Sequence, residues 1–101
     1  MIKYDAIGIV ETLHYAVAVE MLDEMLKSAN VELIHKESAL GGRLVTLFVG
    51  GKTSDVNEAI ETANSVNDKK GGEVLKSAIT ISKPHEEIMK YIVPSNKEKN
   101  I

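Results

Sequence analysis

The run Ala6-Ile7-Gly8-Ile9-Val10, together with the helical pattern that comes after it, decides the fold. The run is short, apolar and rich in β-branched residues, which predicts a buried strand. Ala6 and Gly8 lie on one face of that strand, and their small size leaves room for close packing there. From His14 to Ala29 the apolar spacing changes to that of a helix. The chain therefore opens with a strand that leads directly into a helix.

The predicted helix is apolar over nearly half of its circumference. One set of residues has the spacing of a core-facing stripe: Ala18, Leu22, Met25, Leu26 and Ala29. Tyr15, Val19 and Met21 widen this stripe into an arc that is broad for a helix touching only its own sheet. We expect Thr12 to cap the start of the helix. We expect Asn30, which tolerates the left-handed conformation, to end it.

Three further strands are expected. The apolar or alternating segments that predict them span residues 31–35, 44–49 and 74–81. A hairpin-type connection over residues 37–43 joins the strand over 31–35 to the strand over 44–49. We expect Gly50-Gly51 to break the strand over 44–49.

A second helix lies between the last two of these strands. Ser54 or Asp55 is expected to cap it, and Gly71-Gly72 is expected to end it. Its apolar stripe is narrow and consists of Val56, Ala59, Ile60, Ala63 and Val66.

The element order is therefore β-α-β-β-α-β, followed by a short terminal helix over residues 86–92 that Pro94 stops. This order predicts an α+β, ferredoxin-like fold in which two helices pack on an antiparallel sheet. We expect one domain over residues 1–94 and a polar, frayed tail over residues 95–101.

The composition excludes several classes of function. The 101 residues carry a net charge of −3, so the broad basic surface that nucleic acid needs is not expected. No apolar run is long enough to span a membrane. The absence of cysteine rules out disulfides, thiol catalysis and thiolate-held iron–sulfur clusters.

No motif for catalysis or metal binding is visible. His14, His35 and His85 lack the spacing of metal ligands, and we expect neither a metal nor a cofactor. The stretch Gly50-Gly51-Lys52-Thr53 ends like a phosphate-binding loop, but Thr46 stands where that motif needs glycine. The chain is therefore not expected to be an enzyme.

Several segments together resemble one family, the bacterial microcompartment shell proteins. Residues 6–12 resemble the family's opening strand, and residues 25–31 (Met-Leu-Lys-Ser-Ala-Asn-Val) resemble the lysine-bearing end of its first helix. Leu44-Val45-Thr46 matches the strand after the pore loop, and Lys83-Pro84-His85 corresponds to the family's Arg-Pro-His. The resemblance runs in order over nearly the whole chain.

The resemblance implies a structural role. Six copies would form a flat hexamer with a central pore, and hexamers would tile into a sheet that encloses enzymes. Small polar metabolites would cross the pore. The implied location is the shell of a microcompartment in the bacterial cytoplasm. The implied partners are further copies of this chain, other shell proteins and encapsulated enzymes.

The same resemblance implies residues for the edge between hexamers. Lys27 corresponds to the lysine at that edge, and Asn30, Lys83 and His85 lie beside it in the family pattern. From the residues alone, a second interpretation of Lys27 is as good: a lysine near a helix C-terminus, where the helix dipole favours a positive charge. The corresponding interpretation of Asn30 is that it only ends the helix. Lys83 stands where arginine is usual, and lysine lacks the planar fork of arginine.

The pore loop is implied to be Ser38, Ala39, Leu40, Gly41, Gly42 and Arg43. It is one residue longer than the common Lys-Ile-Gly-Ser-Gly pattern. Six-fold symmetry would turn Arg43 into a ring of positive charge, and Leu40 into an apolar constriction. If Arg43 points away from the opening, a pair with Glu37 is the alternative. A plain Gly-Gly hairpin with a solvated arginine remains the simplest interpretation from the residues.

Two other classes of function fit the fold. A ferredoxin-like module that binds a small ligand as a trimer or dimer is the main alternative, because fold alone does not separate these roles. A small enzyme is the other, although no catalytic constellation supports it.

Overall fold

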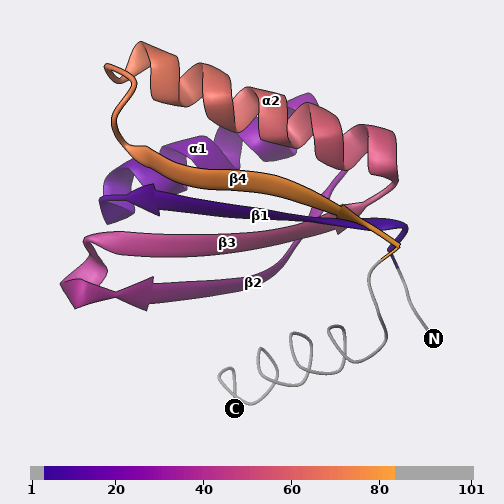
Figure 1. The fold of residues 1–101 in the computed structure, drawn as a ribbon, viewed down its shortest axis with the longest axis horizontal. Coiled ribbons are helices and arrows are strands. Elements are labelled where there is room, and N and C mark those ends of the chain that lie inside the picture. The colour runs from indigo at the N-terminus through magenta and orange to yellow at the C-terminus, as the bar shows by residue number, and fades with distance from the viewer. Residues whose placement is uncertain (1–3, 84–101) are drawn as a thin grey trace.

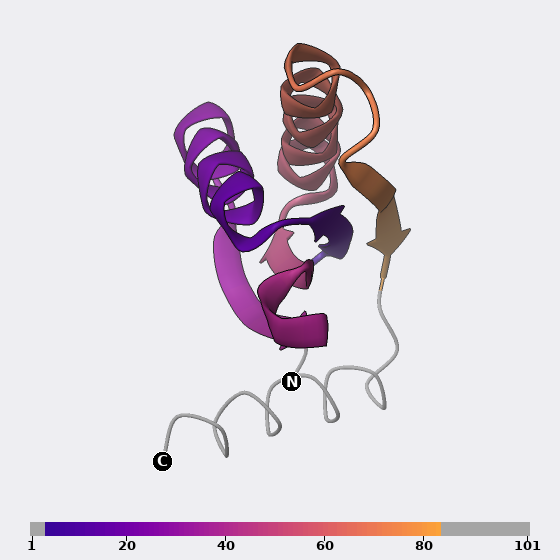
Figure 2. The same ribbon diagram turned by 90° about the vertical axis from the view of Figure 1, so that its left-hand side faces the viewer.

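The computed structural model describes residues 4–83, which form one four-stranded sheet with two helices on one of its faces (Figures 1 and 2). In chain order the elements are β1 (Ala6–Leu13), α1 (Tyr15–Ser28), β2 (Glu32–Ala39), the 3-10 turn η1 (Leu40–Gly42), β3 (Leu44–Gly51), α2 (Thr53–Lys69) and β4 (Leu75–Ser82). The predicted β-α-β-β-α-β order and the ferredoxin-like α+β fold are confirmed. The predicted terminal helix, the tail and His85 lie outside the described residues.

The strands run in the order β2-β3-β1-β4, and each neighbouring pair is antiparallel. Strand β1 is central, pairing with β3 from Ala6 opposite Gly51 to Leu13 opposite Leu44. On its other side β1 pairs with β4, and the register shifts between Glu11 and Thr12. Because neighbouring strands are antiparallel, different loops lie at the two ends of the sheet.

The main core lies between the sheet and the two helices (Figure 2). Helix α1 contributes Ala18, Met21 and Met25 to this core. Helix α2 contributes Val56, Ala59, Ala63 and Val66, which confirms its predicted narrow stripe. A Cβ atom added to Gly8 would lie 3.0 Å from Val56 Cγ1, so the predicted close packing at this glycine is confirmed.

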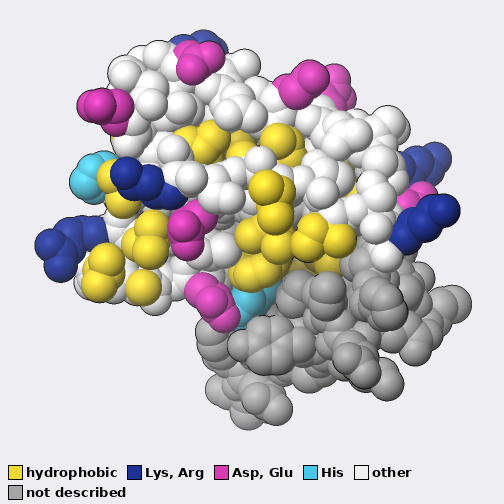
Figure 3. Space-filling view, viewed as in Figure 1, with side chains coloured by type: hydrophobic (Ala, Val, Ile, Leu, Met, Phe, Trp, Pro, Cys, Tyr) yellow, Lys and Arg dark blue, Asp and Glu magenta, His cyan; other side chains and the backbone are white. Residues whose placement is uncertain are grey.

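The opposite face of the sheet carries a smaller apolar cluster. Ile7 and Ile34 are buried there, with Tyr4, Ile9 and Phe48 packed against them. Figure 3 shows apolar side chains gathered over the strands on the side that faces the viewer. Across residues 4–83, no helix combines the length and the hydrophobicity needed to cross a bilayer.

The predicted ends of α1 were wrong. Thr12 does not cap the helix, because it lies in β1, where its buried hydroxyl donates to the carbonyl oxygen of Val74 at 3.0 Å. His14 precedes the helix instead, with a positive φ of 67° and no capping side chain. Asn30 does not end the helix in the left-handed conformation, because Ser28 is the last helical residue and Ala29 is already extended.

Gly50-Gly51 does not break the third strand but belongs to β3. A Cβ atom at Gly50 would come within 2.7 Å of both Ile34 Cδ1 and the Tyr4 ring, and one at Gly51 within 2.9 Å of the Asn30 carbonyl oxygen. Glycine is needed there for close approach rather than for a turn. Lys52 therefore precedes α2, and neither Ser54 nor Asp55 is its cap.

Replacing Gly8 with alanine should destabilise the fold. The added methyl would press on Val56 Cγ1 at 3.0 Å and on Val49 Cγ2 at 3.1 Å. Overpacking of this kind costs about 1–3 kcal/mol, which urea unfolding would measure. Ser77→Thr adds one methyl at an exposed position of β4 and is the control, expected to change stability by less than about 0.5 kcal/mol. Equal stability of Gly8→Ala and the unmodified chain would contradict the close packing.

Candidate functional sites at the two ends of the sheet

The residues predicted as pore loop gather at one end of the sheet. Ser38 and Ala39 are the last residues of β2, η1 makes the turn, and Arg43 precedes β3. At the same end lie the β1–α1 junction and the connection from α2 to β4. The connection was expected to begin at Glu37, but β2 continues two residues further, to Ala39.

Left-handed backbone at three successive residues shapes the turn. Leu40, Gly41 and Gly42 have φ values of 55°, 66° and 87°. Nothing lies within 4 Å of a Cβ atom placed on Gly41, so the conformation and not a lack of space calls for glycine there. Leu40 adopts this conformation without being glycine, and its side chain is 63% exposed.

Arg43 fastens the loop to the rest of the molecule. Its backbone N–H and its Nε–H both donate to the Leu40 carbonyl oxygen, at 3.3 Å and 3.0 Å. Its own carbonyl oxygen accepts from the His14 N–H at 2.9 Å, which ties the loop to the β1–α1 junction. The alternative pair with Glu37 is not formed, since Arg43 bonds to Leu40 while Glu37 Oε1 lies 2.9 Å from His35 Nε2.

Three of the predicted edge residues lie at the opposite end of the sheet. Lys27 is in the last turn of α1, Asn30 lies between α1 and β2, and Lys83 directly follows β4. The Asn30 N–H donates to Asp55 Oδ1 at 3.4 Å, and the Lys83 N–H donates to the Asp5 carbonyl oxygen at 2.7 Å. Strands of eight residues separate this end from the loop by roughly 25 Å.

The Lys27 side chain is largely exposed and bonds within its own helix. Its Nζ lies 2.9 Å from Asp23 Oδ2, and 69% of the side chain is accessible. The hydrogen bond that Lys27 Nζ donates to Asp23, and then the charges of Asp23 and Glu24, raise the pKa of Lys27 above the ordinary lysine value. Glu20, which lies on the same face of the helix, pairs instead with Lys70 at 2.8 Å.

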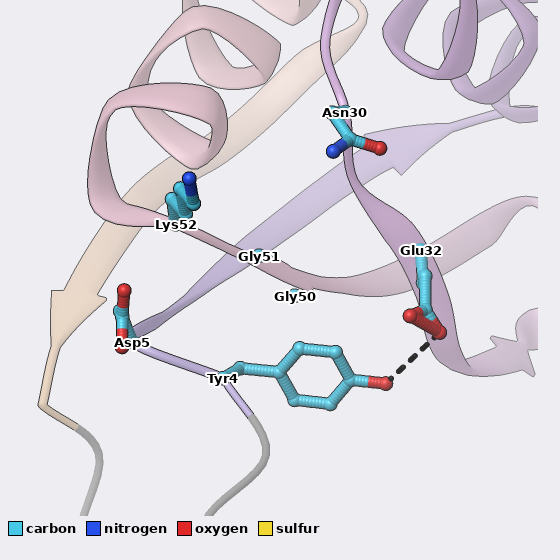
Figure 4. A pocket seen from close by; sticks show the side chains of 7 residues that line it. All are labelled: Tyr4, Asp5, Asn30, Glu32, Gly50, Gly51 and Lys52. Carbon is cyan, nitrogen blue, oxygen red and sulfur yellow. Dashed lines mark hydrogen bonds between the residues drawn. The ribbon is translucent and has the colours of Figure 1, made fainter.

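A polar hollow of about 300 Å³ opens beside Asn30 (Figure 4). Its wall combines backbone at the two strand glycines with polar side chains from several elements: Tyr4, Asp5, Asn30, Glu32, Gly50, Gly51 and Lys52. The Tyr4 hydroxyl donates to Glu32 Oε2 at 3.3 Å, so two of the lining side chains are bonded to each other (Figure 4). Sequence reasoning missed Tyr4, Asp5, Glu32 and Lys52, because only the pairing of the strands brings them together.

The described residues at the two ends of the sheet do not have the arrangement of a metal centre. Among residues 4–83 there is no cluster of three or more histidine, aspartate or glutamate side chains placed to hold an ion. What the two ends offer is hydrogen bonding, charge and shape.

Comparisons with known proteins identify the family of the chain. Residues 6–84 match the model of the BMC domain, which covers most of the chain. The chain belongs to the BMC domain family. It is 42% identical over 93 residues to the carboxysome shell protein CcmK2 of Synechocystis sp., covering 88% of this chain and 84% of that one. It is 34% identical over 91 residues to the carboxysome shell protein CsoS1C of Hydrogenovibrio crunogenus, covering 90% and 87% of the two chains.

A solved structure, of a microcompartments protein from Desulfitobacterium hafniense DCB, shares the fold with a TM-score of 0.77 at 21% identity. It aligns with 89% of this chain, which spans 49% of that one. Membership confirms the predicted family and the structural shell role, with the microcompartment shell as the location. The family is structural, and association with other shell proteins follows from membership.

Removing the Asp23 carboxylate should lower the pKa of Lys27. Asp23→Asn removes the negative charge and leaves at most a weaker hydrogen bond to a neutral amide oxygen, so the Nζ should titrate at a lower pH than in the unmodified chain. NMR titration of the lysine side-chain signals measures this shift. Glu24→Gln is the control and should produce a smaller fall, because Glu24 acts only through its charge. A larger fall with Glu24→Gln would contradict the pairing.

Proposed function

We propose that this chain forms cyclic hexamers that tile into a shell sheet, with a central pore for small polar metabolites. In this arrangement the loop end of each protomer faces the six-fold axis, and the Asn30 end faces the neighbouring hexamer. The observation that carries the proposal is the separation of the two candidate sites by the full length of the strands, roughly 25 Å.

The surface of α1 supports the ring. Tyr15, Val19 and Leu26 lie at helical spacing and are 45%, 50% and 43% exposed. These are residues of the broad apolar arc, and the protomer's own core uses only part of it. An exposed apolar stripe of this kind marks an interaction surface. Leu33 on the edge strand β2 is also 39% exposed, so the apolar surface is not confined to the helix.

The loop supports a pore that favours anions. In a six-fold ring, the exposed Arg43 contributes six positive charges close to the axis. The left-handed turn over Gly41 and Gly42 has no side chain at either residue, so their backbone can come close to the axis of the ring. Leu40, being 63% exposed, lies at the same opening.

The opposite end supports the seam between hexamers. The Lys27 ammonium has three donors, and one is taken by Asp23. The others are available for carbonyl groups across the seam. Asn30 and Lys83 lie at this end of the sheet, and His85 follows Lys83 by two residues. Enzymes enclosed by the sheet are the further proposed partners.

Val19→Glu should prevent ring formation. A carboxylate in the middle of the apolar stripe would have to be desolvated at the interface between subunits. Multi-angle light scattering should show a hexamer for the unmodified chain and smaller species for the variant. Ser65→Glu, which adds a carboxylate at an exposed position of α2, is the control and should remain hexameric. A dimer or trimer in the unmodified chain would instead favour the ligand-binding module.

Lys27→Ala should leave the hexamer intact and block its growth into sheets. The substitution removes the seam donors but touches neither the core nor the apolar stripe of α1. Light scattering reports the hexamer, and negative-stain electron microscopy reports the sheets. Lys69→Ala removes a lysine at the same position of the other helix, its last turn, and should leave sheets unchanged. Normal sheets from Lys27→Ala would exclude the edge role.

A further inference from the structure

We infer that the loop end of each protomer carries a binding cup for a small organic anion, a carboxylate with a short hydrocarbon chain. The cup lies beside the proposed pore, and its position there rests on the proposed function. The binding chemistry itself rests on the protomer alone.

The cup is a hollow of about 580 Å³ at the loop end of the sheet. Pockets that hold small molecules occupy about 300–1,000 Å³, so the size is suitable. It is formed by β1, the β1–α1 junction, the loop, the start of β3 and one residue of β4, which are brought together only by the sheet. Figure 3 shows apolar side chains with basic ones around them at the left-hand end of the molecule.

Three leucines make the cup apolar. Leu13 and Leu44 are directly opposite each other in the β1–β3 pairing, and Leu40 projects from the turn. Leu40 is the most exposed of the large apolar side chains in the described part of the chain, at 63%. A hydrocarbon group lying on these side chains removes apolar surface from water, which favours binding.

Basic groups surround the leucines. Arg43 and Lys76 line the cup, and within residues 4–83 neither of them makes an ion pair. His14 also lines it, and Glu11 is the one carboxylate among the described residues of its lining. With His14 neutral the cup carries a net charge of +1, so it suits a ligand with one negative charge.

Strained backbone frames the same cup. His14 and Leu40 are two of the three non-glycine residues with positive φ among the described residues, and both line it. Such conformations are unfavourable for residues with a Cβ atom, and they concentrate at ligand-binding sites where the surrounding structure holds them. Here the bond from the His14 N–H to the Arg43 carbonyl oxygen joins the two strained segments.

The combination selects the ligand class. An inorganic anion would satisfy Arg43 and Lys76 but leave the leucines in water. A neutral hydrocarbon would cover the leucines but give the two cations no partner. A short-chain carboxylate does both, since its carboxylate accepts charge-assisted hydrogen bonds while its chain lies on the leucines.

Butyrate is the probe, added to the assembled protein with leucine methyl groups labelled for NMR. We expect saturable shifts at Leu13, Leu40 and Leu44, with acetate and 1-butanol each binding at least about tenfold more weakly at equal ionic strength. Lys76→Gln should weaken butyrate binding by about tenfold, the usual effect of losing a charged hydrogen-bond partner. Lys69→Gln, on α2, should not change it.

A second variant tests the apolar half of the cup. Leu40→Gly removes the side chain at a residue whose φ of 55° suits glycine, so the turn is retained. This variant should prefer butyrate over acetate by less than the unmodified chain does, because Leu13 and Leu44 remain in the cup. Equal binding of butyrate and 1-butanol by the unmodified chain, or unchanged butyrate binding in Lys76→Gln, would overturn the inference.

Light scattering on the same samples separates the two proposals. If the chain is hexameric and butyrate does not saturate, the cup is excluded while the shell tile stands. If butyrate saturates a sample that is not hexameric, the cup stands and the proposed ring fails.

Discussion

The antiparallel pairing of β1 with both of its neighbours is the constraint on which the rest of the molecule depends. Ala6, Ile7 and Val10 of this strand are fully buried, so β1 is the centre of both faces of the sheet. Since each neighbour runs the opposite way, the loop after β2 is brought to the β1–α1 junction. The start of β1, the start of β2 and the end of β4 are brought to the other end. The direction of the strands alone therefore places the two candidate sites at opposite ends of the sheet.

Close packing against β1 depends on small residues. Gly8 lets Val56 of α2 approach the strand, and Gly50 lets Tyr4 and Ile34 pack against β3 from the other face. With these contacts made, both helices lie on one face, and α1 is left with more apolar surface than the protomer's core uses. Side chains such as Val19 remain half exposed as a consequence. One sheet with two helices on a single face provides surfaces for neighbours, which suits a structural protein.

The two ends differ in their chemistry. The loop end combines strained backbone, exposed leucine and the cations Arg43 and Lys76. The other end combines the Lys27–Asp23 pair with a polar hollow beside Asn30. The hydrogen bond to Asp23 and its charge raise the pKa of Lys27 above the ordinary lysine value, which favours the ammonium form. The first end suits a small ligand, and the second suits contact with another protein surface.

The order of the elements, the stripe on α2 and the excess width of the apolar arc on α1 were predictable from the sequence. They depend on the spacing of neighbouring residues, which a helix or strand imposes locally. The family was predictable from the resemblance of several segments taken together. Only the tertiary structure decided that Thr12 bonds to Val74 rather than capping α1, and that Gly50-Gly51 continues β3. It also decided which apolar residues stay exposed and which side chains surround the leucine cup. Caps, close approaches and pockets depend on contacts between residues distant in sequence, such as Thr12 and Val74, which are 62 positions apart.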